Sequence, residues 1–278
     1  MKFGAFMFPT DYSIGPAELA TEVEARGFES LWFPEHTHIP TNRQSPYPGG
    51  GELPQEYSHT LDPFVALGAA AAVTERILLG TGISLIIEHD PITLAKIVAT
   101  LDQISDGRVL LGVGGGWNRE EMSNHGTDPS RRWKVLRERI EAMKVIWTQD
   151  EAEYHGEFVD FDPIWSWPKP VQQPHPPIIL GNAGAGAVGR VVSYADEWMP
   201  IGGRVDLPQR LEELKAQAAE AGRGHIPVTN FGTAPNREAI EELIDLGIER
   251  AVMRLPSAPA DVVIPLLDRQ AELVEAFS

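Results

Sequence analysis

Short apolar runs alternate with amphipathic stretches from one end of the chain to the other. Eight of these runs are rich in β-branched and aromatic residues and have the length of a strand. Most of them are apolar on both faces, which is typical of parallel strands that are covered on each side. We therefore predict strands at residues 3–8, 29–33, 76–82, 108–114, 177–181, 197–201, 226–232 and 250–255.

The segments between these runs predict helices, some of them with clear ends. Asp90 followed by Pro91 is a typical helix start, and Asp106 with Gly107 is a typical end. Asn236 is expected to cap another helix, which Gly247 ends. Further helices are predicted at 16–26, 63–74, 131–147, 185–194, 207–221 and 261–277, and apolar residues spaced by three and four make 131–147 the clearest.

Eight successive β–α units in 278 residues predict an α/β fold, a closed (β/α)8 TIM barrel, because such barrels need about 250 residues. We expect a single domain over 1–278. Two segments, 37–61 and 151–176, are longer than barrel connections need to be. Long loops of this kind are often functional, so we expect both to lie at or beside the end of the barrel where active sites form.

Composition removes several classes of function. The chain has no cysteine, which excludes disulfides, iron–sulfur clusters and cysteine nucleophiles. Its 23 Lys and Arg against 40 Asp and Glu give a net charge of −17, which repels nucleic acid and anionic membrane surfaces. The N-terminus resembles neither a secretory signal nor a spanning helix. We therefore expect a cytoplasmic protein with a small-molecule substrate, and neither nucleic acid nor membrane as a partner.

Reactive residues of a barrel stand where its strands end, and the strand at 29–33 leads into Glu35 and His36. A carboxylate beside an imidazole suits proton transfer near neutral pH. A structural histidine bonded to a nearby carbonyl is an equally good interpretation. The pair His36 and His38 also allows a metal site, which we disfavour because the later strand ends, Gly181, Ile201, Gly232 and Leu255, carry no His or carboxylate.

Glycine gathers at two further strand ends. Gly80 and Gly82 end one strand, and Gly112 to Gly116 contain four glycines in five positions before Asn118. A surface without side chains suits a broad, flat ligand, and Asn118 could bind the edge of a ring. The alternatives are relief of crowding within the barrel and a flexible loop that starts a helix.

The strand at 177–181 leads into a glycine motif. Gly184, Gly186 and Gly189 match G-x-G-x-x-G between a strand and a helix, which directs backbone N–H groups at a phosphate. A Rossmann unit would end its next strand with an acidic residue, whereas here Gly202-Gly203-Arg204 follow. The motif therefore predicts a phosphate site and argues against a dinucleotide fold.

Several segments together resemble the luciferase-like monooxygenase superfamily, in particular its branch that uses the deazaflavin coenzyme F420. These segments are LWFPEH, ILLGTGI with HDP, LDQISDGRVLLGVGGGWNREE, and PPIILGNAG with YADEWMP. The resemblance covers nearly the whole chain and implies a bacterial luciferase-like barrel that holds a flavin or deazaflavin ring at its mouth. It also implies a possible homodimer.

The resemblance assigns roles to individual positions. His36, oriented by Glu35, would be the catalytic pair, and Gly82-Ile83 would be the place where the family often has a cis non-prolyl peptide behind the ring. Gly115 stands where other branches carry a catalytic Glu or a phosphate-binding Arg, so sugar-phosphate oxidation and light emission are not supported. The implied cofactor-binding residues are Gly82, Ile83, Ser84, Gly114, Gly115, Asn118, Gly181, Asn182, Ala183, Gly184 and Gly186.

Two functions lead. The first is an oxidoreductase that transfers a hydride between F420 and an organic substrate, with His36 handling the proton. The second is a monooxygenase that uses reduced FMN and oxygen. A metal-dependent hydrolase and a cofactor-storing barrel without activity are further alternatives. Trp117, Trp165 and Trp167 are candidates to line an apolar substrate pocket, and because the net charge opposes an anionic cofactor we expect few cations, such as Arg190, to hold it.

Overall fold

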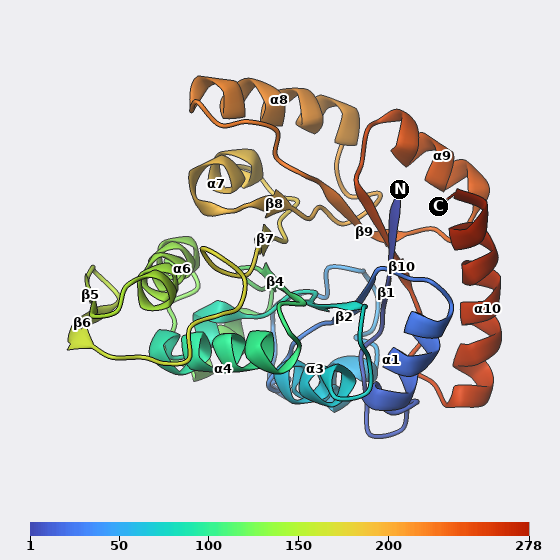
Figure 1. Cartoon of the computed structure of the whole chain (residues 1–278), viewed down its shortest axis with the longest axis horizontal. Coiled ribbons are helices and arrows are strands. Elements are labelled where there is room, and N and C mark those ends of the chain that lie inside the picture. The colour runs from blue at the N-terminus through green and yellow to red at the C-terminus, as the bar shows by residue number, and fades with distance from the viewer. Residues whose placement is uncertain (278) are drawn as a thin grey trace.

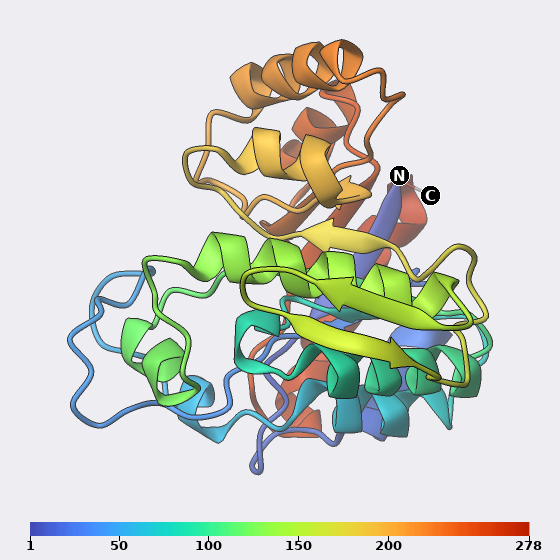
Figure 2. The same ribbon diagram turned by 90° about the vertical axis from the view of Figure 1, so that its left-hand side faces the viewer.

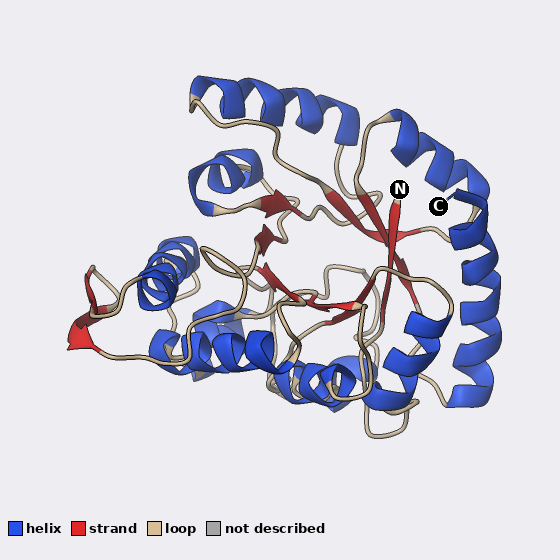
Figure 3. Ribbon diagram, viewed as in Figure 1, coloured by secondary structure: helices blue, strands red, loops and turns tan. Residues whose placement is uncertain are grey.

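The computed structural model describes residues 1–277, and its centre is a barrel of eight parallel strands (Figures 1 and 3). The strands are β1 (Lys2–Phe6), β2 (Ser30–Phe33), β3 (Leu78–Thr81), β4 (Val109–Val113), β7 (Ile178–Leu180), β8 (Glu197–Trp198), β9 (Thr229–Thr233) and β10 (Arg250–Arg254). Their order in the sheet is β8-β7-β4-β3-β2-β1-β10-β9. Isolated parallel bridges, Trp198 to Val228 and Ile201 to Phe231, join the two edges and close the barrel. All eight strand predictions and the predicted fold are confirmed.

Eight helices form the outer layer, as predicted. They are α1 (Pro16–Ala25), α3 (Pro63–Ala71), α4 (Pro91–Ile104), α6 (Arg132–Thr148), α7 (Ala187–Tyr194), α8 (Leu207–Glu220), α9 (Arg237–Asp245) and α10 (Ala260–Phe277). The predicted caps are confirmed, because the side chains of Asp90 and Asn236 accept hydrogen bonds from the backbone N–H groups of Thr93 and Ala239. None of the helices in residues 1–277 combines the length and apolar character needed to cross a membrane.

The inside of the barrel is packed, and one glycine shows how closely. Trp32 on β2 lies beside Gly80 on β3 in the parallel register, and a Cβ on Gly80 would lie 2.2 Å from the Trp32 ring. Only glycine therefore leaves room for this tryptophan, which is fully buried. At the N-terminal end of the strands, buried Arg250 donates hydrogen bonds to Glu29 and Glu197 and ties three parts of the barrel together.

The two long segments have different places. Residues 37–61 contain the short helix α2 (Glu56–His59) and cross the end of the barrel at which β2 ends. The segment 151–176 instead forms an antiparallel hairpin, β5 (Ala152–His155) with β6 (Asp160–Ile164), which lies over α6 (Figure 2). It continues along α4, where Lys96 donates to the carbonyl of Trp167 and Gln103 to that of Lys169. The expectation that both segments border the active-site end is therefore wrong for 151–176.

Candidate functional site

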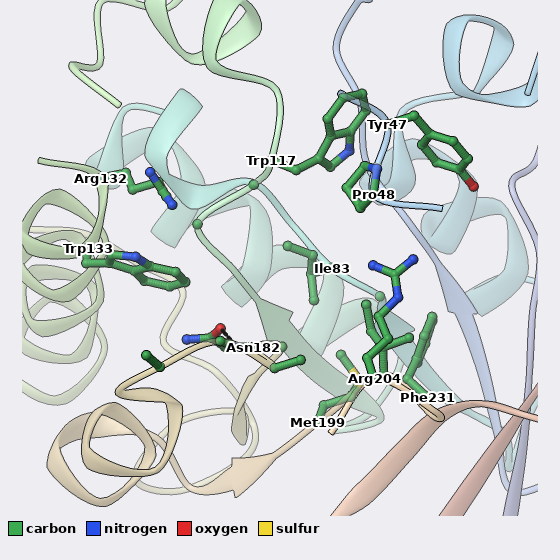
Figure 4. A pocket seen from close by; sticks show the side chains of 18 of the residues that line it. Tyr47, Pro48, Ile83, Trp117, Arg132, Trp133, Asn182, Met199, Arg204 and Phe231 are labelled. Atoms are coloured by element: carbon green, nitrogen blue, oxygen red, sulfur yellow. Dashed lines mark hydrogen bonds between the residues drawn. The ribbon is translucent and has the colours of Figure 1, made fainter. Parts of the chain in front are cut away.

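A cavity of about 480 Å³ opens at the C-terminal ends of the strands, where barrel enzymes have their active sites. Figure 4 shows Ile83 at its centre, Arg132 and Trp133 towards one end, and Arg204 and Phe231 towards the other. The lining residues are Tyr47, Pro48, Tyr57, Gly82, Ile83, Gly115, Gly116, Trp117, Arg132, Trp133, Gly181, Asn182, Ala183, Gly184, Ala185, Met199, Ile201, Arg204 and Phe231. Every charged residue among them is an arginine.

Ile83 enters the cavity on a turn that follows β3. The Gly82–Ile83 peptide bond is cis, as the family resemblance implied. Ile83 packs between two glycines from neighbouring strands, because a Cβ on Gly114 would lie 2.3 Å from its Cδ1 and a Cβ on Gly181 would lie 2.4 Å from its Cγ2. These glycines therefore make space for a side chain of the protein itself, which forms a raised apolar surface inside the cavity.

Glu35 holds this turn in place from behind. Its carboxylate accepts hydrogen bonds from the Ser84 hydroxyl at 2.8 Å, the Leu85 N–H at 2.6 Å and His89 Nε2 at 2.7 Å. Glu35 is 3% exposed and does not line the cavity. Burial opposes ionisation of Glu35, but His89 and the two other donors outweigh it and lower its pKa. The chemistry of Glu35 is therefore that of a fixed anion that positions the Ile83 turn.

His36 is paired with a different carboxylate from the one expected. Its Nδ1–H donates to Glu121 on α5 (Arg119–Asn124) at 2.7 Å, while Glu35 faces His89. The predicted orientation of His36 by Glu35 is wrong, because consecutive residues after the strand point to opposite sides. His36 Nε2 accepts a hydrogen bond from the Trp117 indole at 3.3 Å. Trp117 thus lies between His36 and the cavity. Its indole N–H is hydrogen-bonded to His36 Nε2, the atom that would exchange a proton with a substrate.

A third buried glutamate lies next to this pair. The carboxylate of Glu88, on the short 3₁₀ helix η1 (Ile86–Glu88), has only 1% of its side chain exposed and lies 3.4 Å from the Thr37 hydroxyl. Burial, together with the charges of Glu121 and Glu35, raises the pKa of Glu88 to about 9. Glu88 is therefore protonated at neutral pH, while Glu35 is ionised.

The other end of the cavity can receive an anion. Arg190 stacks on the Trp133 ring at 4.1 Å and Arg132 lies 5.5 Å from the same ring. The turn before α7 ends at Gly186, which has a left-handed backbone conformation. Its φ of +74° favours glycine. Within residues 1–277 the N–H groups of Ala185 and Gly186 donate no hydrogen bond. Free N–H groups at a helix start beside two arginines suit a phosphate.

The predicted cofactor-binding residues divide into two groups. Those that line the cavity are Gly82, Ile83, Gly115, Gly181, Asn182, Ala183 and Gly184. Ser84, Gly114 and Asn118 lie behind its wall: Ser84 binds Glu35, and Asn118 caps α5 and is 1% exposed. Gly186 does not line the cavity either, but it is exposed next to the lining residue Ala185. The amide nitrogens of Asn118 and Asn182 are buried without a partner in residues 1–277, and of the two residues only Asn182 lines the cavity. Trp117 lines the cavity, whereas Trp165 and Trp167 are 78% and 56% exposed on the distant hairpin segment and do not.

Several lining residues had no signal in the sequence. Tyr47 and Tyr57 come from the 37–61 segment, which was expected at this end of the barrel but offered no individual candidate residue. Arg132 and Arg204 lie beyond the strand ends, where a single sequence cannot separate a ligand-binding arginine from a surface one. In the part of the chain that the structure describes, no three His, Asp or Glu side chains form a group that could hold a metal ion.

Comparison with known proteins identifies the family. The model of the luciferase-like monooxygenase family matches residues 15–261. The chain belongs to the luciferase-like monooxygenase family. It is therefore an oxidoreductase with the fold predicted above.

Individual relatives and solved structures resemble the chain to different extents. An uncharacterized protein of Mycobacterium tuberculosis is 44% identical over 276 residues, 98% of each chain. The FMNH2-dependent dimethylsulfone monooxygenase of Pseudomonas putida is 33% identical over 153 residues, 53% of this chain and 42% of that one. Among solved structures, an F420-dependent secondary alcohol dehydrogenase in complex with an F420–acetone adduct superimposes over 100% of this chain and 99% of its own with a TM-score of 0.76, at 19% identity. That last likeness concerns the fold alone.

Proposed function

We propose that the protein is an F420-dependent oxidoreductase that transfers a hydride between the deazaflavin and an organic substrate. The observation that carries this choice is a second hollow beside the cavity. It measures about 310 Å³, shares Arg132 with the cavity, and is lined by Arg119, Asp128, Pro129, Ser130 and Arg132. In residues 1–277 neither Arg119 nor Arg132 makes an ion pair.

A path for an anion therefore continues beyond the phosphate turn. A single phosphate would be satisfied by the α7 turn with Arg132 and Arg190. The deazaflavin F420 has an acidic tail after its phosphate. This tail would extend into the hollow and reach Arg119. Asp128 is the one acidic group there, and its carboxylate is occupied by the hydroxyl and N–H of Ser130.

The cavity also fits a flat ring. Ile83 offers a raised apolar surface, the Gly115 and Gly116 backbone carries no side chain, and Asn182 offers an amide nitrogen without a partner. When bound, a deazaflavin supplies hydride transfer to or from a substrate carbon. Glu35 keeps Ile83 in position, and Glu121 holds the Nδ1 proton of His36. His36 can accept or donate a proton at Nε2 once the Trp117 indole has moved away from that atom.

Cofactor binding tests the proposal directly. We expect the purified protein to bind F420 at least tenfold more tightly than FMN, as followed by quenching of tryptophan fluorescence. Arg119→Gln should weaken F420 binding about tenfold, because it removes one charge-assisted contact, and should leave FMN binding unchanged. Arg137→Gln is the control, because Arg137 on α6 pairs with Glu141 and lines neither the cavity nor the hollow. Tighter binding of FMN, or no effect of Arg119→Gln on F420, would contradict the proposal.

The second candidate is a monooxygenase that uses reduced FMN. The similarity to the Pseudomonas putida enzyme favours it, and the α7 turn with its two arginines would suffice for the single phosphate of FMN. Oxygen consumption that depends on added reduced FMN, with no reduction or oxidation of F420 by any substrate, would establish this candidate instead.

A further inference from the structure

The end of the cavity remote from the phosphate turn carries one positive charge among apolar walls. Arg204 lies in the turn after β8, where its N–H binds the Ile201 carbonyl at 3.2 Å. Figure 4 shows its side chain directed into the cavity beside Phe231, on the far side of Ile83 from Arg132 and Trp133. This end is therefore separated from the place where a cofactor phosphate would bind.

Arg204 has no partner within the protein. In residues 1–277 its guanidinium makes neither an ion pair nor a hydrogen bond, and no acidic residue lines the cavity. Arg204 is exposed where it lines the cavity, so its guanidinium is open to a ligand that enters from solvent. An anion would supply the missing partner.

The other walls at this end are aromatic or aliphatic. Tyr47, Tyr57 and Trp117 contact one another edge to face, with ring centroids 5.2 to 6.3 Å apart. Phe231 and Met199 close the opposite side. Such walls favour the burial of an apolar body, and aromatic rings in particular pack well against other rings.

We propose that the substrate is an organic acid with an apolar, preferably cyclic body, whose carboxylate binds Arg204 while its reacting carbon lies against the Ile83 side of the cavity. Arginine binds a carboxylate through two parallel hydrogen bonds. One guanidinium balances one negative charge, so a carboxylate fits this apolar end better than a doubly charged phosphate does. The location of the reacting carbon rests on the proposed function, whereas the anion site at Arg204 does not.

Matched pairs of ligands test the inference. The probes are 3-phenylpropanoate, indole-3-acetate and cyclohexanecarboxylate, each compared with its own amide, which has nearly the same shape and no charge. Binding to the full chain is followed by quenching of tryptophan fluorescence, since Trp117 and Trp133 line the cavity. We expect at least one acid to bind ten times more tightly than its amide. Arg204→Gln should remove this preference, and raising NaCl should reduce it.

Arg210→Gln is the matched control, because Arg210 lies nearby on α8, pairs with Glu213 and does not line the cavity. It should keep the preference for the acid. Equal binding of acid and amide in all three pairs, or a preference that survives Arg204→Gln, would overturn the inference.

F420 binding by the same variants separates this inference from the proposed function. We expect Arg204→Gln to bind F420 within twofold of the unaltered protein. If Arg204→Gln weakens F420 binding as strongly as Arg119→Gln, Arg204 serves the cofactor and the inference is wrong while the proposed function stands. If the protein prefers the acid through Arg204 but binds FMN rather than F420, the proposed function fails and the anion site at Arg204 stands.

Discussion

At the scale of single residues, the most informative finding is that Glu35 and His36 do not contact each other as an acid–base pair but bind different partners. They are neighbours in the sequence, which suggested one acid–base pair. In the structure Glu35 faces Ser84, Leu85 and His89, and His36 faces Glu121. A contact over 85 positions leaves no trace in a single sequence, so the residue types predicted proton chemistry at this strand end but not its partners.

Glu121→Gln should change the proton position on His36. A hydrogen bond to a charged acceptor contributes about 1.5–3 kcal/mol, so its replacement by a neutral amide should shift the ratio of the Nδ1–H and Nε2–H tautomers by about tenfold or more. Nitrogen-15 NMR of the histidine side chains measures this ratio without a substrate. Glu35→Gln is the control, and it should leave the His36 signals in place. The reverse result would show that Glu35 orients His36 after all.

At the scale of elements, the glycines at the ends of β3 and β4 were predicted to make room for a ligand, with relief of crowding in the barrel and a flexible loop as alternatives, and the structure shows side chains of the protein close to several of them. Gly114 and Gly181 accommodate Ile83, and a Cβ on Gly115 would lie 3.0 Å from the Trp133 ring. A glycine in a sequence indicates that something comes close and does not say what. The expectation for the two long segments was right for one of them: 37–61 contributes to the cavity and 151–176 does not.

Gly114→Ala tests whether these elements fit together through Ile83. The new Cβ would lie 2.3 Å from Ile83 Cδ1 and 3.1 Å from the Gly181 carbonyl oxygen, so Ile83 must move. Overpacking of this kind costs about 1–3 kcal/mol. We expect a lower melting temperature by calorimetry and at least tenfold weaker cofactor binding. In Gly68→Ala, on α3 and outside the cavity lining, nothing lies within 4 Å of the new Cβ, so equal losses in both variants would argue against this role of Ile83.

At the scale of the whole molecule, local periodicity was enough to predict all eight strands and eight outer helices, because each must bury an apolar face against the barrel. The hairpin β5–β6 escaped prediction, since its strands are mostly exposed and polar. The net charge of −17 suggested that few cations would hold an anionic cofactor. The structure shows that charge is distributed unevenly, with Arg132 and Arg204 as the charged residues that line the cavity.

This uneven distribution also gathers like charges in the interior. Burial is the largest cause of the raised pKa of Glu88, the nearby charges of Glu121 and Glu35 raise it further, and Thr37 and Arg139 act in the opposite direction. Its pKa in the folded protein is about 9, against an ordinary value of 4.5. Between these two pH values the folded state binds one more proton at Glu88 than the unfolded state does. The stability from protonated Glu88 is therefore complete below the lower value and is lost as the pH rises towards the higher one.

Glu88→Gln should consequently make the protein less sensitive to alkaline pH. One extra bound proton corresponds to a fall of about 1.4 kcal/mol in the free energy of unfolding per pH unit, or roughly 3 °C in melting temperature for a chain of this size. The neutral amide has no proton to lose, so the melting temperature of the variant should fall less between pH 6 and pH 9. The control is Glu272→Gln, an exposed position on α10, which should follow the unaltered protein. Parallel curves for all three proteins would mean that Glu88 is already ionised in the folded state at pH 6.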